Sequence, residues 1–142
     1  MNLQRVKTGD DVGIIGGGFV GQILKRAYPQ ALIYDKNIRF DSILDVLERP
    51  VIFIAINLPD NALEEHSKEE LRILLRQMRE GTIVIIKSTF VPGTTDWLQQ
   101  EFTFLKFCYN PEFLTEMTAW EDFSHPQFQN AYQLPQNHVG LL

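Results

Sequence analysis

A run of glycines near the amino terminus is the feature of this sequence that most clearly predicts chemistry. Gly16-Gly17-Gly18-Phe19-Val20-Gly21 matches the pattern G-x-G-x-x-G. In this pattern the first glycine permits a tight turn, the second lets the backbone approach a pyrophosphate, and the third lets a helix pack closely on a strand. The first N–H groups of that helix attract phosphates. The pattern follows an apolar run and opens a helical stretch, which favours dinucleotide binding over the alternative of a purely structural glycine turn.

An acidic residue follows the glycines at a suitable distance. Asp35 stands 17 residues after Gly18, at the end of the next apolar run. An acid about 20 residues beyond the glycines is expected to accept hydrogen bonds from the adenosine ribose and to repel the 2′-phosphate of NADP. The sequence therefore predicts NAD as the cofactor, although Lys36 could soften this discrimination and Asp35 could instead cap the turn before Asn37. The residues predicted to hold NAD from these two segments are Gly16, Gly18, Phe19, Val20, Gly21, Asp35 and Lys36.

Two later segments also place polar side chains directly after apolar runs. Residues 86–95 read Ile-Lys-Ser-Thr-Phe-Val-Pro-Gly-Thr-Thr, and residues 110–116 read Asn-Pro-Glu-Phe-Leu-Thr-Glu. Ligands of open α/β sheets bind at the carboxyl ends of the strands, so both segments are expected to share one edge with the glycines. The alternatives are that Ser88 and Thr89 cap the following turn, and that Glu112 and Glu116 form a first-turn pair favoured by a helix dipole.

Alternating strands and helices are needed to bring these segments together, and the hydrophobic pattern predicts them. The fold class is α/β: a Rossmann-type doubly wound parallel sheet with three layers, α/β/α. The expected strands are 12–15, 31–34, 51–56, 82–86 and 102–109. The expected helices are 19–28, 40–48 with Ile43, Leu44 and Leu47 on one side, a helix from a cap at Asp60 or Asn61 to Gly81, and one after Pro92-Gly93. The buried stripe expected on the third helix is Leu63, Leu71, Leu74, Leu75 and Met78.

Length and composition fit one globular domain. The 142 residues are 44% hydrophobic and 22% charged. We expect an amino-terminal extension over 1–11, an NAD-binding domain over 12–126, and a Gln/Asn-rich loop or edge element over 127–142. The net charge of −5 argues against nucleic acids and anionic membranes as partners. There is no apolar signal core and no run near the roughly 18 residues of a membrane span, so the cytoplasm is the expected location.

Together with residues 12–16, the two later segments resemble the amino-terminal domain of the UDP-glucose/GDP-mannose dehydrogenase family. Members carry a Lys-Ser-Thr-Val-Pro-x-Gly-Thr segment and an Asn-Pro-Glu-Phe-Leu-Arg-Glu-Gly segment in this order. The resemblance implies an NAD-dependent oxidoreductase that oxidises C6 of a UDP- or GDP-linked sugar from alcohol through aldehyde to acid. By position, it assigns Thr89 to the nicotinamide and the catalytic water, with Ser88 beside it at the cofactor, and Glu116 to general acid–base catalysis. It assigns substrate binding to Glu112, Phe113 and Leu114.

Some features of the family are changed or missing in these residues. Thr115 and Met117 replace the arginine and glycine of the second segment, and Leu58-Pro59 replaces a Thr-Pro. The family's catalytic cysteine lies in a Gly-x-Gly-x-Cys loop that is absent here, and Cys108 is expected to be a buried small hydrophobe. The three histidines show no metal-ligand spacing. We therefore expect the cofactor half of a dehydrogenase, inactive alone, with a missing catalytic domain or a homo-oligomer as partner; the alternative is a stand-alone NAD(H)-binding sensor or partner-binding module.

Overall fold

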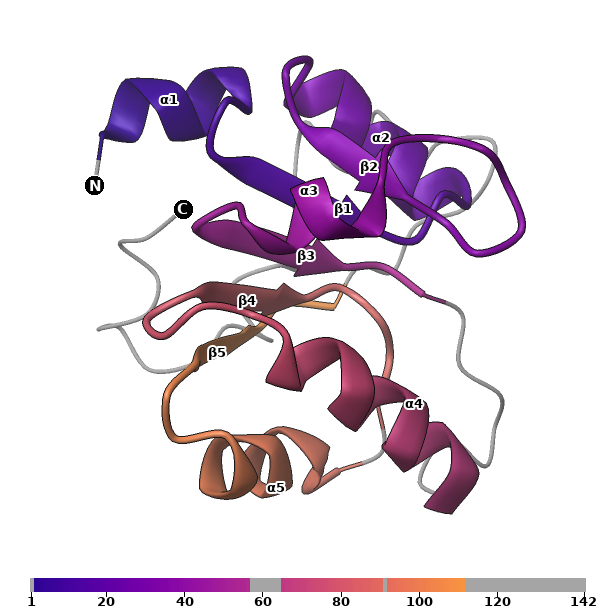
Figure 1. The fold of residues 1–142 in the computed structure, drawn as a ribbon, viewed down its shortest axis with the longest axis vertical. Coiled ribbons are helices and arrows are strands. Elements are labelled where there is room, and N and C mark those ends of the chain that lie inside the picture. Colours follow the sequence, from indigo (N-terminus) through magenta and orange to yellow (C-terminus); the bar gives the residue numbers. More distant parts are fainter. Residues whose placement is uncertain (1, 57–64, 91, 112–142) are drawn as a thin grey trace.

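The computed structural model describes residues 2–56, 65–90 and 92–111, with the backbone alone at 65–67. In this part of the chain five parallel strands form one sheet, in the order β2-β1-β3-β4-β5. Helices cover both faces of the sheet (Figure 1), which confirms the predicted three-layer Rossmann-type fold. The strands are β1 (Val12–Ile15), β2 (Leu32–Tyr34), β3 (Val51–Ile54), β4 (Ile83–Ile86) and β5 (Lys106–Tyr109).

The three central strands are apolar on both sides because both of their faces are covered. Every residue of β1, β3 and β4 is buried, as expected for parallel strands between two helical layers. The register brings the last residues of the strands into one row. Ile15 pairs with Tyr34 on one side and Ile54 on the other, and Ile54 pairs with Ile86. The segments that follow these strands therefore emerge at one carboxyl edge.

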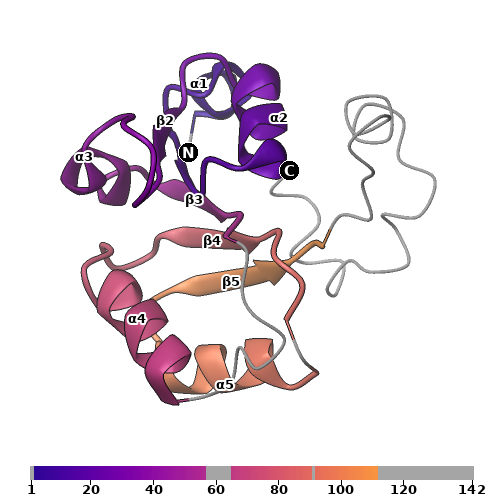
Figure 2. The same cartoon turned by 90° about the vertical axis from the view of Figure 1, so that its right-hand side faces the viewer.

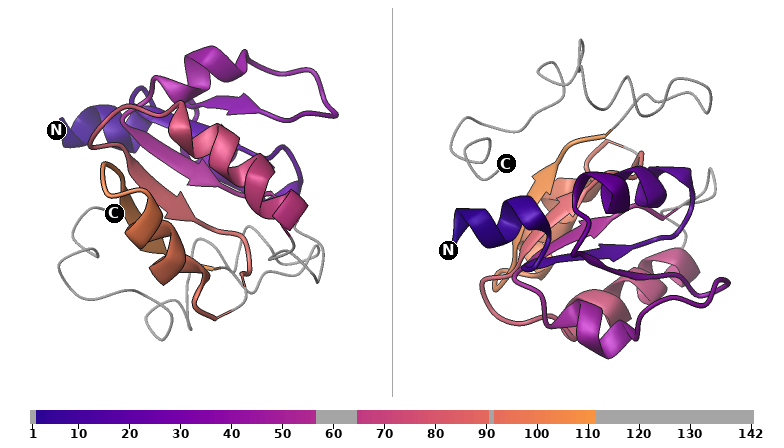
Figure 3. Two further views of the ribbon diagram at one scale, coloured as in Figure 1. Left: turned by 60° about the horizontal axis from the view of Figure 1, so that its bottom comes forward. Right: turned by 90° about the horizontal axis from the view of Figure 1, so that it is seen from above.

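The helices divide between the two faces of the sheet. Helices α1 (Leu3–Thr8) and α2 (Phe19–Ala27) supply Val6 and Leu24 to one buried cluster. Helices α3 (Ile43–Leu47), α4 (Glu65–Arg76) and α5 (Thr94–Glu101) supply the other. Figure 2 and the right panel of Figure 3 show α1 and α2 on the side of the sheet opposite to α3 and α4. In the described residues, both faces of the sheet are thus covered by helices.

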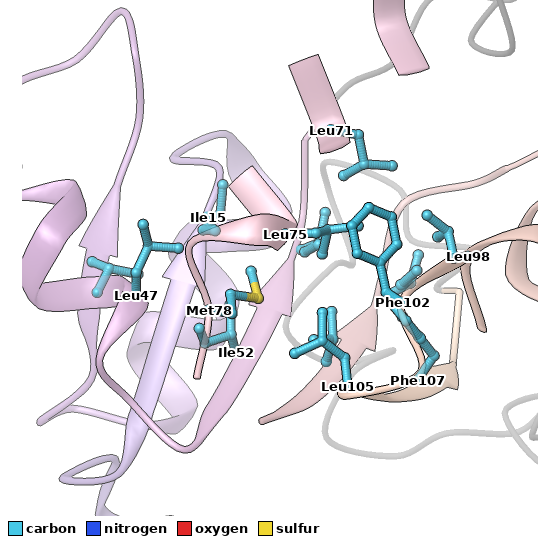
Figure 4. Close-up of a cluster of buried hydrophobic side chains, with 14 of the residues drawn as sticks. Ile15, Leu47, Ile52, Leu71, Leu75, Met78, Leu98, Phe102, Leu105 and Phe107 are labelled. Carbon is cyan, nitrogen blue, oxygen red and sulfur yellow. The ribbon is translucent and has the colours of Figure 1, made fainter. Parts of the chain in front are cut away.

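A dense hydrophobic cluster fixes α4 and α5 on their face of the sheet. Leu71 and Leu75 of α4 meet Leu98 of α5, Phe102 and Phe107 in this cluster (Figure 4), and all five are buried. Burying a leucine or phenylalanine side chain stabilises a fold by about 1.5–3 kcal/mol. Of the apolar positions predicted for the stripe on this helix, Leu71, Leu75 and Met78 are buried. Leu74 is only partly buried, and Leu63 lies outside the described residues.

The structure corrects three predicted boundaries. The strand expected over 102–109 is only β5, because the N–H of Phe102 donates to Leu98 O (2.8 Å) as the cap of α5 and residues 102–105 turn. The helix expected over 40–48 is only α3, and Leu44 on its predicted apolar side is 66% exposed. Helix α4 ends at Arg76, whereas Gly81 lies in the turn before β4. The predicted caps Asp60 and Asn61 lie outside the described residues.

The sequence did not indicate helix α1. Asn2 caps it by accepting hydrogen bonds from the N–H groups of Gln4 (3.0 Å) and Arg5 (3.4 Å), and Gly9 ends it in the left-handed conformation. Val6 is buried in the same cluster as β1 and α2. Part of the segment expected to be an amino-terminal extension therefore packs on the domain core.

Candidate functional site

The order of the strands defines a crevice at the carboxyl edge. From β1 the chain passes to β2 on one side, and β3 then pairs with β1 on the other side. Ligands of doubly wound sheets bind at this reversal of strand order. The glycine run follows β1 there. Gly16 N–H donates to Tyr34 O (2.8 Å), which ties the run to β2, and Ala55 N–H, just after β3, donates to Ile15 O (2.8 Å), the residue before the run.

Two of the predicted glycines are required by the packing of the chain itself. Gly16 has φ +116°, and a Cβ there would lie 2.2 Å from the carbonyl oxygen of Ala55. A Cβ on Gly21 would lie 1.8 Å from the carbonyl oxygen of Gly16. No side chain fits at such distances, so Gly16 makes the tight turn and Gly21 lets α2 approach β1, as predicted.

Gly18 differs from these two glycines. Its φ is −71°, and a Cβ built on it would meet no atom within 4 Å. Neither the backbone conformation nor a neighbouring atom therefore requires glycine at this position. Gly18 is the N-cap of α2 and offers no side chain to the free N–H groups of the first turn. An open glycine before a helix N-terminus is the feature that a pyrophosphate group needs, so the glycine run fits a dinucleotide.

Asp35 lies beside this turn and is already bound by the backbone. Its Oδ2 accepts a hydrogen bond from Gly17 N–H (2.8 Å), and its Oδ1 accepts one from Asn37 N–H (2.8 Å). These two donors, and to a smaller extent the backbone N–H of Ile38 and the charge of Lys36, lower the pKa of Asp35 below its ordinary value. The turn cap that the sequence left as an alternative is thus present. Each carboxylate oxygen has a second lone pair that can accept a ribose hydroxyl.

Phe40 is a neighbour of the glycine turn that the sequence did not indicate. A Cβ on Gly17 would lie 2.6 Å from Cε2 of Phe40 and 3.0 Å from Cβ of Asp35. The ring therefore covers Gly17, which explains a third glycine where the pattern needs none. Asp41 holds the loop in place, because its carboxylate accepts from Ile33 N–H (2.9 Å) and its own N–H donates to Ile33 O (2.9 Å). Gly17, a glycine that the G-x-G-x-x-G pattern does not require, was the one feature of the sequence that could have indicated a close neighbour such as Phe40.

The hydroxyl segment after β4 lies at the same edge, and its two predicted residues differ in environment. Ser88 is buried and its hydroxyl donates to Ile56 O (2.6 Å), so that proton is used within the chain. Thr89 is exposed, and its hydroxyl makes no hydrogen bond with the described residues. Of the two hydroxyls, that of Thr89 is thus the one open to a ligand.

The last described residues are the first two of the second family segment. Asn110 N–H donates to Ile86 O (2.9 Å), which extends the pairing of β4 and β5. The side-chain oxygen of Asn110 is buried without a hydrogen-bond partner in the described part of the chain. Of the predicted site residues, Glu112, Phe113, Leu114 and Glu116 lie outside the described residues, as do Thr115, Met117 and Leu58-Pro59.

Comparison with known protein families decides the assignment. Residues 24–128 match the model of the UDP-glucose/GDP-mannose dehydrogenase family, NAD binding domain. The chain belongs to the UDP-glucose/GDP-mannose dehydrogenase family. The match includes Asp35, Ser88, Thr89 and the segment from Asn110, and it begins after the glycine run. The glycine geometry is thus a separate observation in favour of the same cofactor, and NAD is the cofactor of this dehydrogenase domain.

Solved structures with the same fold include members of this dehydrogenase family. The UDP-N-acetyl-mannosamine dehydrogenase of Staphylococcus aureus is 14% identical with a TM-score of 0.67, and the match covers 92% of this chain and 43% of that one. GDP-mannose dehydrogenase of Pseudomonas aeruginosa is 15% identical with a TM-score of 0.60, over 92% and 42% of the two chains. The chain thus spans less than half the length of these proteins. A search of curated protein sequences finds no match.

Cys108 is a further residue of this dehydrogenase domain that could carry chemistry. Cys108 is buried on β5, and burial raises the pKa of its thiol, so the predicted role as a small hydrophobe is confirmed. The described residues hold no group of three or more His, Cys, Asp or Glu side chains that could bind a metal ion. Within the same residues, no helix has the length and apolar character needed to cross a membrane.

Proposed function

We propose that this chain is the cofactor half of a nucleotide-sugar 6-dehydrogenase, which holds NAD at the carboxyl edge of its sheet. The observation that carries the proposal is the open Gly18 at the N-terminus of α2, with the Asp35 carboxylate one residue away at Gly17. Gly18 leaves room for the pyrophosphate. Asp35 accepts the ribose hydroxyls and disfavours NADP, since a 2′-phosphate would meet a carboxylate held in its charged form.

In the proposal, the segments after β4 and β5 bind the nicotinamide end of the cofactor. Support comes from the strand order, in which β4 and β5 lie on the β3 side of the crevice, away from β2 and Asp35. NAD⁺ bound across this edge would supply the hydride acceptor for oxidation of the sugar alcohol. In the proposal, the free hydroxyl of Thr89 contacts the nicotinamide end and the catalytic water. Glu116 moves the proton, and Glu112, Phe113 and Leu114 contact the nucleotide sugar, as the resemblance to the family implies.

The second oxidation, from aldehyde to acid, calls for a nucleophile that these residues do not supply. A thiolate would form a covalent adduct with the aldehyde. The one cysteine of the chain, Cys108, is buried on β5, and burial raises the pKa of its thiol. We therefore propose that a partner region carrying the family's cysteine loop completes the enzyme. A cytoplasmic location fits this proposal, because NAD and nucleotide sugars are cytoplasmic metabolites.

The experiment that tests this proposal follows NADH formation by the purified 142-residue chain with NAD⁺ and a panel of UDP- and GDP-linked sugars. We expect binding of NADH, detected by quenching of tryptophan fluorescence, and no NADH formation with any sugar. NADH formation by the chain alone would contradict the assignment as a cofactor half. Binding of NADH unaffected by every nucleotide sugar, even with a cysteine-bearing partner region added, would favour the alternative of a stand-alone NAD(H)-binding module.

A further inference from the structure

Thr89 lies between two residues that are each tied to a neighbouring strand. On its amino side, Ser88 is anchored to β3 by two groups. Its hydroxyl donates to Ile56 O (2.6 Å), and its backbone N–H donates to Ile54 O (3.2 Å). The chain immediately before Thr89 is therefore held by the strand at the centre of the crevice.

On its carboxyl side, Phe90 is held by Tyr109, the last residue of β5. The N–H of Phe90 donates to the phenolic oxygen of Tyr109 (3.1 Å), and the hydroxyl of Tyr109 donates to the carbonyl oxygen of Phe90 (3.4 Å). The two rings stack, with centroids 6.5 Å apart and planes at 17°. One phenol thus binds both backbone polar groups of a single loop residue, and the Phe90 ring is buried in the core below it.

Between these two anchors, Thr89 is exposed and its own hydroxyl makes no hydrogen bond with the described residues. A loop held on both sides with a free hydroxyl at its centre is the arrangement that a preorganised binding group requires. We propose that Tyr109 is a positioning residue: with Ser88 on the other side, it fixes the backbone so that the Thr89 hydroxyl faces the nicotinamide end of NAD. This inference rests on the proposed function, in which Thr89 contacts that end.

The consequence of losing the Tyr109 hydroxyl is specific to one end of the cofactor. Tyr109→Phe keeps the ring and its stacking on Phe90 but removes the partner of two backbone groups. The loop then samples more conformations, and binding must order it again, which weakens affinity. Only ligands that reach Thr89 are affected. NADH contains the nicotinamide, whereas ADP-ribose offers the same adenosine and pyrophosphate without it.

The test is a calorimetric titration of NADH and ADP-ribose into the full 142-residue chain and three variants, Tyr109→Phe, Thr89→Ala and the double variant. One lost hydrogen-bonded contact corresponds to about a three- to tenfold change in affinity. We expect Tyr109→Phe to weaken the affinity for NADH by this factor and to leave the affinity for ADP-ribose unchanged. In the Thr89→Ala background, Tyr109→Phe should cause no further loss, since it acts through Thr89. Tyr28→Phe, at the far end of α2 from the glycine turn, is the matched control and should change neither affinity.

Three results would overturn the inference while leaving the proposed function intact. These are an unchanged NADH affinity in Tyr109→Phe, an equal loss for ADP-ribose, and additive losses in the double variant. The last two would mean that Tyr109 supports the fold rather than Thr89. If the unmodified chain bound neither NADH nor ADP-ribose, the proposed function would fail, and this inference with it.

Discussion

The Asp35 carboxylate binds two backbone N–H groups, those of Gly17 and Asn37, before any ligand is considered. These bonds keep it charged and fix its direction, so that in the proposed function the same carboxylate closes the turn and accepts the ribose hydroxyls. This double use explains why the two roles, a turn cap and a cofactor contact, could not be separated by sequence alone. Both follow from one acidic residue at the end of one strand.

A pH-dependent contribution to stability follows from the lowered pKa of Asp35. The unfolded value is about 3.9, and the folded value is lower. The charged carboxylate therefore stabilises the fold at pH values above the unfolded pKa, and this contribution is lost as the pH falls through the folded pKa. We expect Asp35→Asn to lower the free energy of unfolding at neutral pH by about 1 kcal/mol, after allowance for solvent screening.

Urea unfolding of both proteins at a series of pH values measures this contribution. The difference between them should be constant near neutrality and should shrink toward zero in acid. A difference of the same size at every pH would show that the charge of Asp35 has no part in it.

In the unit formed by β1, the glycine turn and α2, different glycines are needed for close packing and for the proposed binding of the cofactor. Gly16 and Gly21 are required by close contacts, whereas Gly18 faces open space. Gly21→Ala places a methyl group against the carbonyl of Gly16, and overpacking of this kind costs about 1–3 kcal/mol. Gly18→Ala should leave the stability of the fold nearly unchanged. It should weaken NADH binding by at least tenfold, because the methyl group occupies the space left for the pyrophosphate.

Thermal unfolding together with NADH titration distinguishes these two glycines, and each variant serves as the control for the other. A large loss of stability in Gly18→Ala, or an unchanged NADH affinity in it, would contradict the role assigned to this glycine.

Elements with strong hydrophobic signals were predicted correctly, and the misplaced ones have physical reasons. The runs at β1 and β3 begin where predicted because their residues are buried on both faces. The strand expected over 102–109 was too long, since Phe102 and Leu105 are buried in a turn rather than in a strand. Helix α1 was not predicted because it buries a single residue, Val6, and so has no hydrophobic periodicity. The residues that indicate its two ends are the capping Asn2 and the terminal Gly9.

The contacts that the sequence missed are those between segments far apart in the chain. Phe40 over Gly17 depends on how the loop after β2 folds back on the edge strand. The anchoring of Phe90 by Tyr109 depends on the pairing of β4 with β5. The hydroxyl of Ser88 donates to Ile56 O, a contact that the sequence did not indicate, and its contact with the cofactor stays a prediction. Polar residues directly after apolar runs predicted groups at the carboxyl edge. The contacts of each group depend on strand register and loop folding, which the sequence pattern does not give.

In the described part of the chain, helices cover both faces of the five-stranded sheet (Figure 2). The described domain is that of the UDP-glucose/GDP-mannose dehydrogenase family, and the chain spans less than half the length of the solved relatives. Its fold, its glycine turn and Asp35 are all accounted for by binding a dinucleotide. A redox reaction on a sugar requires, in addition, groups on the opposite side of that cofactor.

We propose that the carboxyl edge of the sheet binds NAD(H) through the glycine turn and Asp35. Calorimetric titration of NADH and NADPH into the 142-residue chain and its Asp35→Ala variant tests it most directly. We expect one NADH site per chain, at least tenfold weaker binding of NADPH, and a marked loss of NADH affinity in Asp35→Ala. Absence of NADH binding, or equal affinity for the two cofactors with no effect of Asp35→Ala, would contradict it.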